Sequence, residues 1–489
     1  MFSKAKESEI TLRTIMVLAG AGLILVQIIL FREIGTVLHS TELSLTLVLV
    51  TFFLSLTIGY LISTPFSQRA VEAFVLTAGV FQIFLVPIIR ALGIVGEWSG
   101  WELVGHLSIL GLTGLVASSL FSIFLPRFSK DPKSLVSLYL WELSGSALGV
   151  GLSFMSIAIG HNLLISLHQV VVIILLILVL GRKRNLIFLI PSLVAVAIFS
   201  INLREPANRK YFEIKEGIYS ARVLTSQYSE YQKIDIIEGN IDSIRKRFFY
   251  LDGWRQVGRE PEDLLNKTLA ELAIYLPNVP HNDVMIAGSG ISTIVPVLLP
   301  VFKHVVSVEV DKDVVREFLK WTRPDLIKEK GWEVVIDDAY HYLLQTDRTF
   351  DVVINNVTGP FYLQSVRIFS ENFFQLARKH LNFDGVYVTY LPEPFSEKSK
   401  SSYEVITGLR NVFDSVAVFN HRPSGNGFAI AGALPYEDMK RIVALAHWGD
   451  EDVVWFTPEE VYNLSHGANP INEWNYRILW RSGWKKLFD

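Results

Sequence analysis

The first 200 residues of the chain are dominated by long windows that contain no charged side chain. A helix that crosses a bilayer needs about 20 consecutive apolar residues, and six windows approach or exceed that length: 14–31, 43–68, 73–89, 103–126, 143–181 and 185–203. The fifth window is long enough for two helices, and the turn signal Gly160-His161-Asn162 lies inside it. Splitting the window there, with its first helix starting near Leu135, predicts seven membrane spans.

The pattern changes after residue 203. Residues 204–215 form a charged connector, and two β-rich runs at 221–238 and 247–256 predict a small antiparallel β unit. Residues 264–275 have helical periodicity. Strand-like segments then alternate with helical ones such as 314–321 and 370–380; the expected strands are 284–287, 304–310, 333–336, 351–355, 385–390, 415–419 and 427–431. This alternation predicts a doubly wound, Rossmann-like α/β sheet whose last two strands pair antiparallel.

Charge and composition agree with that division. Residues 1–202 carry 12 Lys/Arg and 9 Asp/Glu, and the remaining residues carry 33 Lys/Arg and 39 Asp/Glu. The fold class is therefore a multi-pass α-helical membrane domain followed by an acidic α/β domain. The chain has no cysteine, which excludes disulfides, thiolate zinc sites and a cysteine nucleophile. We expect no metal, and the charge balance disfavours a nucleic-acid partner.

The distribution of Lys and Arg between the loops predicts how the membrane domain is oriented in the bilayer. On one side of the membrane, the N-terminal tail and the loops would carry ten cations: Lys4, Lys6, Arg13, Arg69, Arg127, Lys130, Lys133, Arg182, Lys183 and Arg184. The other side would carry Arg32 and Arg90 before the large domain. Because cytoplasmic loops are enriched in Lys and Arg, the N-terminus is expected in the cytoplasm. With seven spans, the domain after residue 203 is then extracytoplasmic.

Four polar residues within the expected spans are candidates for function, because such residues are costly in a membrane; they are Gln27, His106, Glu142 and His168. For Glu142 we expect an ion pair with Arg32 or an interfacial position, with a transport or catalytic role as the alternative. Glycines at 145, 149 and 151 are expected to let two helices approach closely. No broken helices in matched halves are evident, which disfavours a transporter.

The first strand of the α/β region ends in Ala287-Gly288-Ser289-Gly290, where glycines let the backbone approach a ligand at a helix N-terminus. The second strand ends at Glu309, which is placed to accept hydrogen bonds from ribose hydroxyls. A dinucleotide fingerprint needs glycine where Thr293 stands, so the loop favours an adenosyl ligand over NAD. The third strand ends in Asp337-Asp338-Ala339, where a carboxylate either meets the adenine amine or only caps the next helix.

Together these segments resemble the catalytic domain of spermidine synthases, the polyamine aminopropyltransferases. The resemblance runs through the glycine loop, Val308-Glu309-Val310-Asp311, Val335 to Ala339 and Phe350 to Ile354, and upstream through Ser229 to Ile234 and Leu251-Asp252-Gly253. It implies a class I methyltransferase or spermidine synthase type fold and S-adenosylmethionine or its decarboxylated form as cofactor. The binding residues that it implies are Gln232, Gly288, Ser289, Gly290, Glu309, Asp337, Asp338 and Ala339. The first span and the Tyr139 to Gly149 helix resemble versions fused to a membrane domain.

The chain departs from the family pattern on the polyamine side. The family's catalytic strand ends in Asp-x-x-Asp-Pro, and here both carboxylates are replaced, by Asn356 and Gly359. The family's Tyr-His pair falls at Leu265 and Asn266, and the acidic residue of its glycine loop falls at Gly290. An asparagine cannot take a proton from an ammonium group, and general-base assistance is typically worth about 10²–10⁴-fold. The catalytic residues therefore remain unassigned.

These observations predict four regions: membrane domain 1–203, connector and β unit 204–262, synthase-like domain 263–435, and a tryptophan-rich extension 436–489 that either rests on the membrane or packs in the core. We expect adenosyl-dependent group transfer to an unidentified acceptor, by methyl or aminopropyl transfer but not to putrescine. The alternative is a non-catalytic sensor or scaffold in a membrane complex; a transporter with a regulatory domain is a third reading. Expected partners are the lipid bilayer, an adenosyl ligand, and a membrane protein or a second copy of the chain.

Overall fold

The computed structural model describes most of the chain, in two compact units, residues 1–254 with 487–489, and residues 255–486. The residues described are 9–38, 42–63, 65–99, 111, 119–181, 185–241, 243–258, 262–288, 293–357, 359–360, 362–472, 475–479 and 481. The division falls within one short strand, so the small β unit belongs with the helices that precede it. Each unit is described by itself.

Unit 1 is a bundle of apolar helices that ends in a small sheet. The helices are α2 (Glu9–Leu38), α3 (Glu42–Ser63), α4 (Gln68–Ile83), α5 (Leu85–Ser99), α7 (Phe124–Phe128), α8 (Pro132–Ile159), α9 (His161–Leu180) and α10 (Leu186–Glu216). Among the described residues, five helices are long and apolar enough to cross a membrane, or six when the bent pair α4–α5 is taken as one span. The expected split of the fifth window is confirmed, since α8 ends and α9 begins at Gly160. The expected span 103–126 lies mostly outside the described residues.

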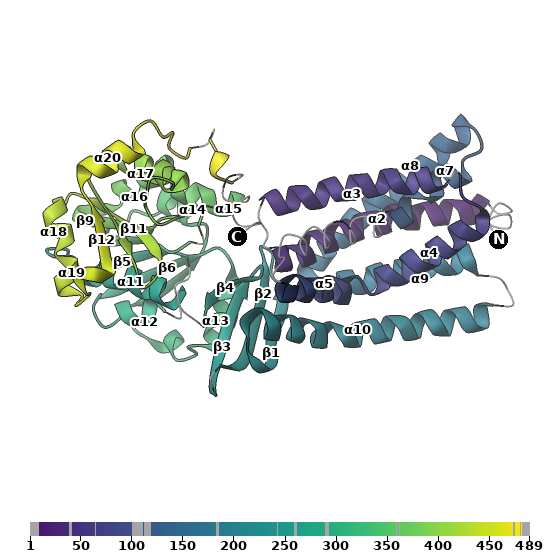
Figure 1. Cartoon of the computed structure of the whole chain (residues 1–489), viewed down its shortest axis with the longest axis horizontal. Helices are drawn as coiled ribbons and strands as arrows, with labels where there is room; N and C mark the ends of the chain where they lie inside the picture. Colours follow the sequence, from purple (N-terminus) through teal and green to yellow (C-terminus); the bar gives the residue numbers. More distant parts are fainter. Residues whose placement is uncertain are drawn as a thin grey trace. The chain divides into compact units, whose positions relative to one another are not determined.

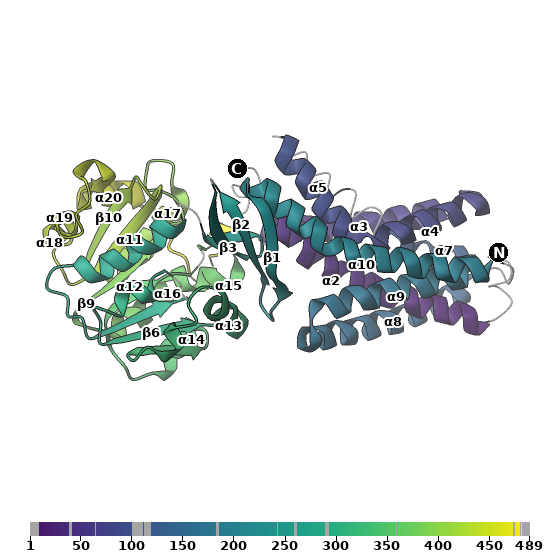
Figure 2. The same ribbon diagram turned by 90° about the horizontal axis from the view of Figure 1, so that it is seen from below.

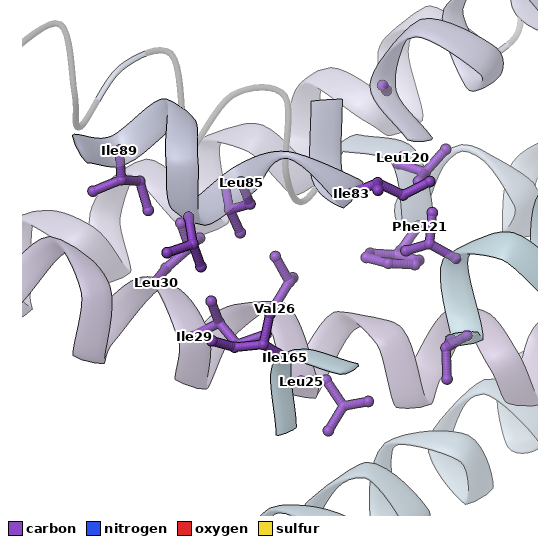
Figure 3. Packing of buried hydrophobic residues seen from close by; sticks show 14 of the residues in the cluster. Leu25, Val26, Ile29, Leu30, Ile83, Leu85, Ile89, Leu120, Phe121 and Ile165 are labelled. Carbon is purple, nitrogen blue, oxygen red and sulfur yellow. The ribbon is translucent and has the colours of Figure 1, made fainter. Parts of the chain in front are cut away.

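Among the described helices of the bundle, α2 contributes the most side chains to the buried apolar cluster, and it lies among the other helices. Figure 3 shows Val26 and Ile29 of α2 beside Ile165 of α9, with Phe121 nearby. The same apolar cluster continues into the β unit, because Phe248 and Tyr250 of the sheet belong to it. The helices and the β unit therefore share one hydrophobic core.

Glycines in α8 allow it to lie directly against α2. A Cβ added at Gly145 would lie 2.0 Å from the backbone oxygen of Val17, and one added at Gly149 would lie 2.9 Å from that of Ala21. This contact confirms the packing role expected for Gly145 and Gly149. The same expectation was wrong for Gly151, because a Cβ added there meets nothing within 4 Å. It also explains why Glu142 does not pair with Arg32: the backbone of Glu142 lies beside Gly20, twelve residues or about 18 Å along α2 from Arg32. Arg32 instead lies over the ring of Tyr228.

The third expected span, 73–89, is broken rather than continuous. Helices α4 and α5 meet at an angle of 76°, and Pro87 explains the break because it has no N–H to donate to the carbonyl four residues earlier. That carbonyl, Ile83 O, accepts hydrogen bonds from Gln169 Nε2 (2.8 Å) and Ser200 Oγ (2.6 Å) instead. A carbonyl in an apolar bundle needs such a partner, so α9 and α10 stabilise the bend.

The charged connector expected at 204–215 is helical, since α10 remains helical to Glu216 before the β unit begins. Its strands are β1 (Tyr219–Tyr228), β2 (Lys233–Ile241), β3 (Ile244–Leu251) and β4 (Trp254–Val257), in the order β1-β2-β3-β4. The run expected at 221–238 is thus two strands joined by a turn. Figures 1 and 2 show this sheet at the end of the bundle where α2 and α10 end, opposite the end where α2 begins.

Unit 2 is the expected α/β sheet, with eight strands in the order β12-β10-β11-β9-β8-β5-β6-β7. The strands are β5 (Asp283–Ala287), β6 (His304–Glu309), β7 (Trp332–Ile336), β8 (Phe350–Asn355), β9 (Leu381–Tyr390), β10 (Ser415–His421), β11 (Asn426–Gly432) and β12 (Val453–Phe456). Strands β5 to β9 are parallel, and β10 and β11 pair antiparallel as expected. The chain order reverses direction between β5 and β8, which is where such sheets bind ligands.

Helices cover both faces of this sheet. Helices α11 (Glu262–Tyr275) and α12 (Val295–Leu298) pack on one face, and α14 (Ala339–Gln345), α16 (Glu371–Lys379) and α17 (Lys400–Val412) pack on the other. Two tryptophans of the C-terminal stretch take the core alternative: Trp448 lies against Phe419 and donates to Glu271, and Trp455 also packs on Phe419. Trp474, Trp480 and Trp484 lie outside the described residues.

The glycine contact between α2 and α8 gives a matched prediction. Gly145→Leu places a side chain against the Val17 backbone, which cannot move aside, so we expect a loss of about 3 kcal/mol in unfolding free energy, the upper end for overpacking. Gly151→Leu, six residues along the same helix, meets nothing within 4 Å of the added Cβ and should be close to neutral. Thermal unfolding of the full chain in detergent measures both. Equal midpoints for the two variants would contradict the packing.

Candidate functional site

Backbone hydrogen bonds join the carboxyl ends of four neighbouring segments of unit 2. Gly288 N donates to Val308 O (2.9 Å), Asp337 N donates to Glu309 O (3.2 Å), and Asn356 N donates to Ala287 O (2.8 Å). These bonds bring the loops after β5, β6, β7 and β8 to one edge of the sheet. The predicted residues Gly288, Glu309, Asp337 and Asn356 therefore lie along one edge, as their strand positions predicted.

Position 288 requires a glycine because of its backbone conformation and the close approach of a neighbouring loop. Its φ is +97°, a conformation that residues with a Cβ rarely adopt. A Cβ there would lie 2.7 Å from the backbone oxygen of Asn356. The close approach of the β5 and β8 loops thus explains this glycine before any ligand is considered. The predicted Ser289 and Gly290 lie outside the described residues.

The acidic side of the edge is formed by β6 and β7. Glu309 is partly exposed, and its Oε1 accepts from Asp311 N (3.0 Å), which turns the chain into α13 (Lys312–Trp321). Asp337 accepts from Asp338 N (2.8 Å) and pairs with His341 Nδ1 (2.8 Å). The His341 partner was missed by sequence reasoning, although its spacing of four residues from Asp337 on a helix start is a usable signal.

Asp338 caps a helix, which is one of the two roles that the sequence suggested for the Asp337-Asp338 pair. Its Oδ1 accepts from His341 N (3.0 Å) at the N-terminus of α14, whose first residue is Ala339. One carboxylate oxygen suffices for this cap, and the residue is only partly buried. Capping and contact with a ligand are therefore compatible in the same side chain.

The β8 side of the edge is neutral. The sequence from 355 to 360 is Asn-Asn-Val-Thr-Gly-Pro, without a carboxylate. Its fold is fixed by Asn355 Oδ1, which accepts from Val357 N (3.2 Å), and by Tyr390 Oη, which donates to Val357 O (2.8 Å). Burial raises the pKa of Tyr390, so its hydroxyl stays protonated and available as a donor. Gly359 O accepts from Ser365 Oγ (2.7 Å).

Other predicted residues are placed as follows. On α11, Asn266 is buried and Leu265 packs against the apolar cluster of that face. Gln232 lies in unit 1, in the turn between β1 and β2, where its N–H donates to Ser229 Oγ (3.0 Å). The structure thus groups the residues at the sheet edge in unit 2 and places Gln232 in the other unit. Among the described residues, no cluster of His, Cys, Asp and Glu suited to a metal ion was found.

Fold and edge together define a Rossmann-like α/β domain with carboxylates at the strand ends where nucleosides bind. Residues 262–421 match the model of the Spermine/spermidine synthase domain. Residues 262–421 of this chain are therefore a spermidine synthase-like domain.

Similar proteins carry consistent names. The polyamine aminopropyltransferase of Thermoplasma acidophilum is 27% identical over 200 residues, which are 40% of this chain and 71% of that protein. The polyamine aminopropyltransferase of Thermotoga petrophila is 28% identical over 269 residues, 52% of this chain and 81% of that protein. The spermidine synthase structure from Thermotoga maritima has 24% identity and a TM-score of 0.38, covering 54% of this chain and 87% of that one.

A pair of substitutions at Asp338 can test whether this residue only caps α14 or also contacts a ligand. Serine caps a helix as well as aspartate does, whereas alanine costs about 1 kcal/mol. We expect Asp338→Ser to keep the unfolding free energy of the full chain but to lose affinity for S-adenosylmethionine, while Asp338→Ala loses both. Denaturant unfolding and calorimetry measure the two effects. Unchanged affinity in the serine variant would assign Asp338 to capping alone.

Proposed function

We propose that the protein is a membrane-anchored spermidine synthase-like protein that binds an adenosyl ligand, S-adenosylmethionine or its decarboxylated form, for group transfer to an acceptor other than putrescine. The observation that carries the proposal is the uneven charge of the sheet edge. Carboxylates stand at the ends of β6 and β7, where the ribose and adenine of such a ligand would need acceptors. The β8 loop, where a dicationic acceptor would need anions, has none.

The neutral β8 loop limits the chemistry of transfer. An amine nucleophile must lose a proton before it attacks, and neither Asn356 nor Gly359 can accept one. A buried cation without an anionic partner is also costly. These two requirements argue against a diamine and favour an acceptor that is uncharged or brings its own base; methyl transfer remains the variant of the reaction to test beside aminopropyl transfer.

A second candidate function is a non-catalytic sensor or scaffold. This function needs ligand binding but no catalytic base, so the neutral β8 loop is compatible with it. The orientation that we propose below also favours it, because adenosyl cofactors are cytoplasmic compounds. The two functions share the binding step and differ in whether a product forms.

Ligand binding tests the proposal directly. Glu309→Gln keeps an acceptor for Asp311 N but replaces the other carboxylate oxygen by a donor, so a ribose hydroxyl loses its acceptor. We expect the full chain to bind S-adenosylmethionine, its decarboxylated form or methylthioadenosine in calorimetry, and the variant to bind about tenfold more weakly. With decarboxylated S-adenosylmethionine and putrescine, no spermidine should form.

The outcomes separate the readings. Binding without any methylated or aminopropylated product favours the sensor, and no binding of the three compounds at millimolar concentration contradicts the adenosyl proposal. Spermidine at a turnover of about 1 s⁻¹, the lower range of ordinary enzymes, would show that other residues replace the lost carboxylates. Asn356→Asp with Gly359→Asp should not restore that activity, because Leu265, Asn266 and Gly290 would remain.

For the orientation, we propose a cytoplasmic N-terminus and an extracytoplasmic β unit and α/β domain. Support comes from unit 1 alone: α2 begins at the end of the bundle opposite the β unit (Figure 1), so a bundle that spans the membrane puts the N-terminus and the sheet on opposite sides. Ten loop or tail cations belong to the N-terminal side by the sequence count, and cytoplasmic loops are enriched in such residues.

Cysteine labelling tests the orientation without background, since the chain has no native cysteine. Lys398 is exposed and Ser401, three residues away, is 1% exposed. A membrane-impermeant maleimide should label Lys398→Cys in intact cells and leave the matched Ser401→Cys unlabelled. Lys133→Cys, exposed at the start of α8, should react only after lysis. Labelling of Lys398→Cys only after lysis would reverse the orientation.

A further inference from the structure

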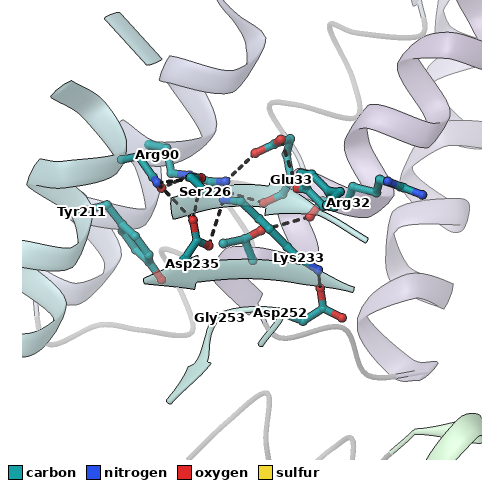
Figure 4. Close-up of polar contacts among 12 residues, drawn as sticks. Arg32, Glu33, Arg90, Tyr211, Ser226, Lys233, Asp235, Asp252 and Gly253 are labelled. Carbon is teal, nitrogen blue, oxygen red and sulfur yellow. Dashed lines mark hydrogen bonds and ion pairs between the residues drawn. The ribbon is translucent and has the colours of Figure 1, made fainter. Parts of the chain in front are cut away.

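Four charged side chains are buried where the helices of unit 1 meet its β unit. Glu33 of α2 is 3% exposed, Arg90 of α5 is 1%, and Lys233 and Asp235 of β2 are 4% and 0% exposed. Figure 4 shows them between the helix ends and the sheet. Two anions and two cations balance, which is the condition for keeping charges in an apolar surrounding.

Glu33 is the centre of the first half of this network. Its carboxylate forms an ion pair with Arg90, whose Nη1 also donates to the Glu33 backbone oxygen (3.0 Å). His161 Nε2 lies 3.0 Å and Tyr228 Oη 3.1 Å from Glu33 Oε1. Helices α2, α5 and α9 and strand β1 therefore meet at one carboxylate.

Asp235 is the centre of the second half. Lys233 Nζ lies 3.1 Å from its Oδ2, and Ser226 Oγ donates to its Oδ1 (2.6 Å). Asn208 of α10 joins the halves, because its Nδ2 donates to Asp235 Oδ1 (3.3 Å) and its Oδ1 accepts from Arg90 Nε (3.2 Å). The network is continuous from α2 to β2.

The network holds both sides of the turn that contains Gln232. Tyr228 is the last residue of β1 and Lys233 is the first residue of β2, so residues 229–232 are bounded by two of its members. Lys233 N also donates to Asp252 Oδ1 (2.8 Å). The turn is therefore anchored on both sides by residues of the network.

Charge makes the anchoring depend on Glu33. Burial, with the adjacent Arg90 cation, lowers the pKa of Lys233, while Asp235 and Glu33 oppose that change. Without the Glu33 charge, Arg90 and Lys233 would share the single anion Asp235. Two buried cations that share one carboxylate repel each other. Lys233 would then move more easily than Arg90, because the strand end that carries Lys233 continues into a turn.

We propose that Glu33 is a positioning residue, which acts through Tyr228 and Lys233 to fix the 229–232 turn to the helices α2, α5, α9 and α10. The inference rests on the proposed function only where it concerns a ligand: if Gln232 is a binding residue, a change at Glu33 alters the affinity for an adenosyl compound. The coupling of the turn to the helices stands on unit 1 alone.

A spin label at the turn tests the coupling without ligand. Tyr231 is 42% exposed, and Tyr231→Cys gives the full chain a single cysteine. We expect the nitroxide spectrum to become more mobile when Glu33→Gln is added. Glu142→Gln, which changes an equally buried carboxylate in α8 that lies outside the network, should leave it unchanged. Tyr228→Phe removes only the hydroxyl that contacts Glu33, and should change the spectrum in the same direction if Glu33→Gln fails to fold.

Calorimetry with S-adenosylmethionine tests the consequence. We expect Glu33→Gln to weaken binding about tenfold, and the double variant with Gln232→Ala to be no weaker than Gln232→Ala alone, the mark of two residues acting through one element. Unchanged spectra in both Glu33→Gln and Tyr228→Phe overturn the proposal. A wild-type chain that binds no adenosyl compound contradicts the proposed function, while the spectra still decide the coupling.

Discussion

The carbonyl oxygen of Ile83 needs a hydrogen bond that its own helix cannot supply, and the arrangement of unit 1 depends on how that need is met. Pro87 has no N–H for it, so Gln169 of α9 and Ser200 of α10 donate to it. With the carbonyl satisfied, α5 can leave the direction of α4 at 76° without a buried unpaired group. The bend places α5 beside α10 and α2, and Arg90 on α5 then reaches Glu33 and Asn208. The sheet is held by the same residues.

A second constraint follows from the first, because buried charges have to balance. Arg90 is tolerated inside the bundle only with Glu33, and Lys233 only with Asp235. Apolar packing alone would fix the sheet less specifically, since side chains such as Phe248 pack with many neighbours, whereas hydrogen bonds to a carboxylate have direction. The β unit is thus part of unit 1 in two respects: it shares the hydrophobic core of the helices and completes their charge pairs.

The α/β sheet was predicted well from the sequence, because hydrophobic periodicity, strand length and the turn residues between strands are all local features. Gly288, Glu309 and Asp338 were placed correctly at strand ends for the same reason. The break at Phe84 was missed, since one proline near the end of the expected span 73–89 is compatible with a continuous helix. Only the donors from α9 and α10 make the bend stable. The Glu33 network was missed because its partners are 57, 128 and 195 residues away in the chain. Such pairings are set by the tertiary fold, not by spacing.

Two of the carboxylates at the sheet edge also have structural roles within unit 2. Glu309 and Asp338 each have a local role, one turning the chain into α13 and the other capping α14. Their presence would therefore be favoured in this fold even in a protein that binds no ligand. In the β8 loop, Asn355 and Tyr390 hold the backbone, and position 356 carries an asparagine. An asparagine there keeps a hydrogen-bonding group of the same size as aspartate but removes its charge and basicity. The loss of charge and basicity at this position supports the proposal that proton abstraction from a diamine is not the task of this site.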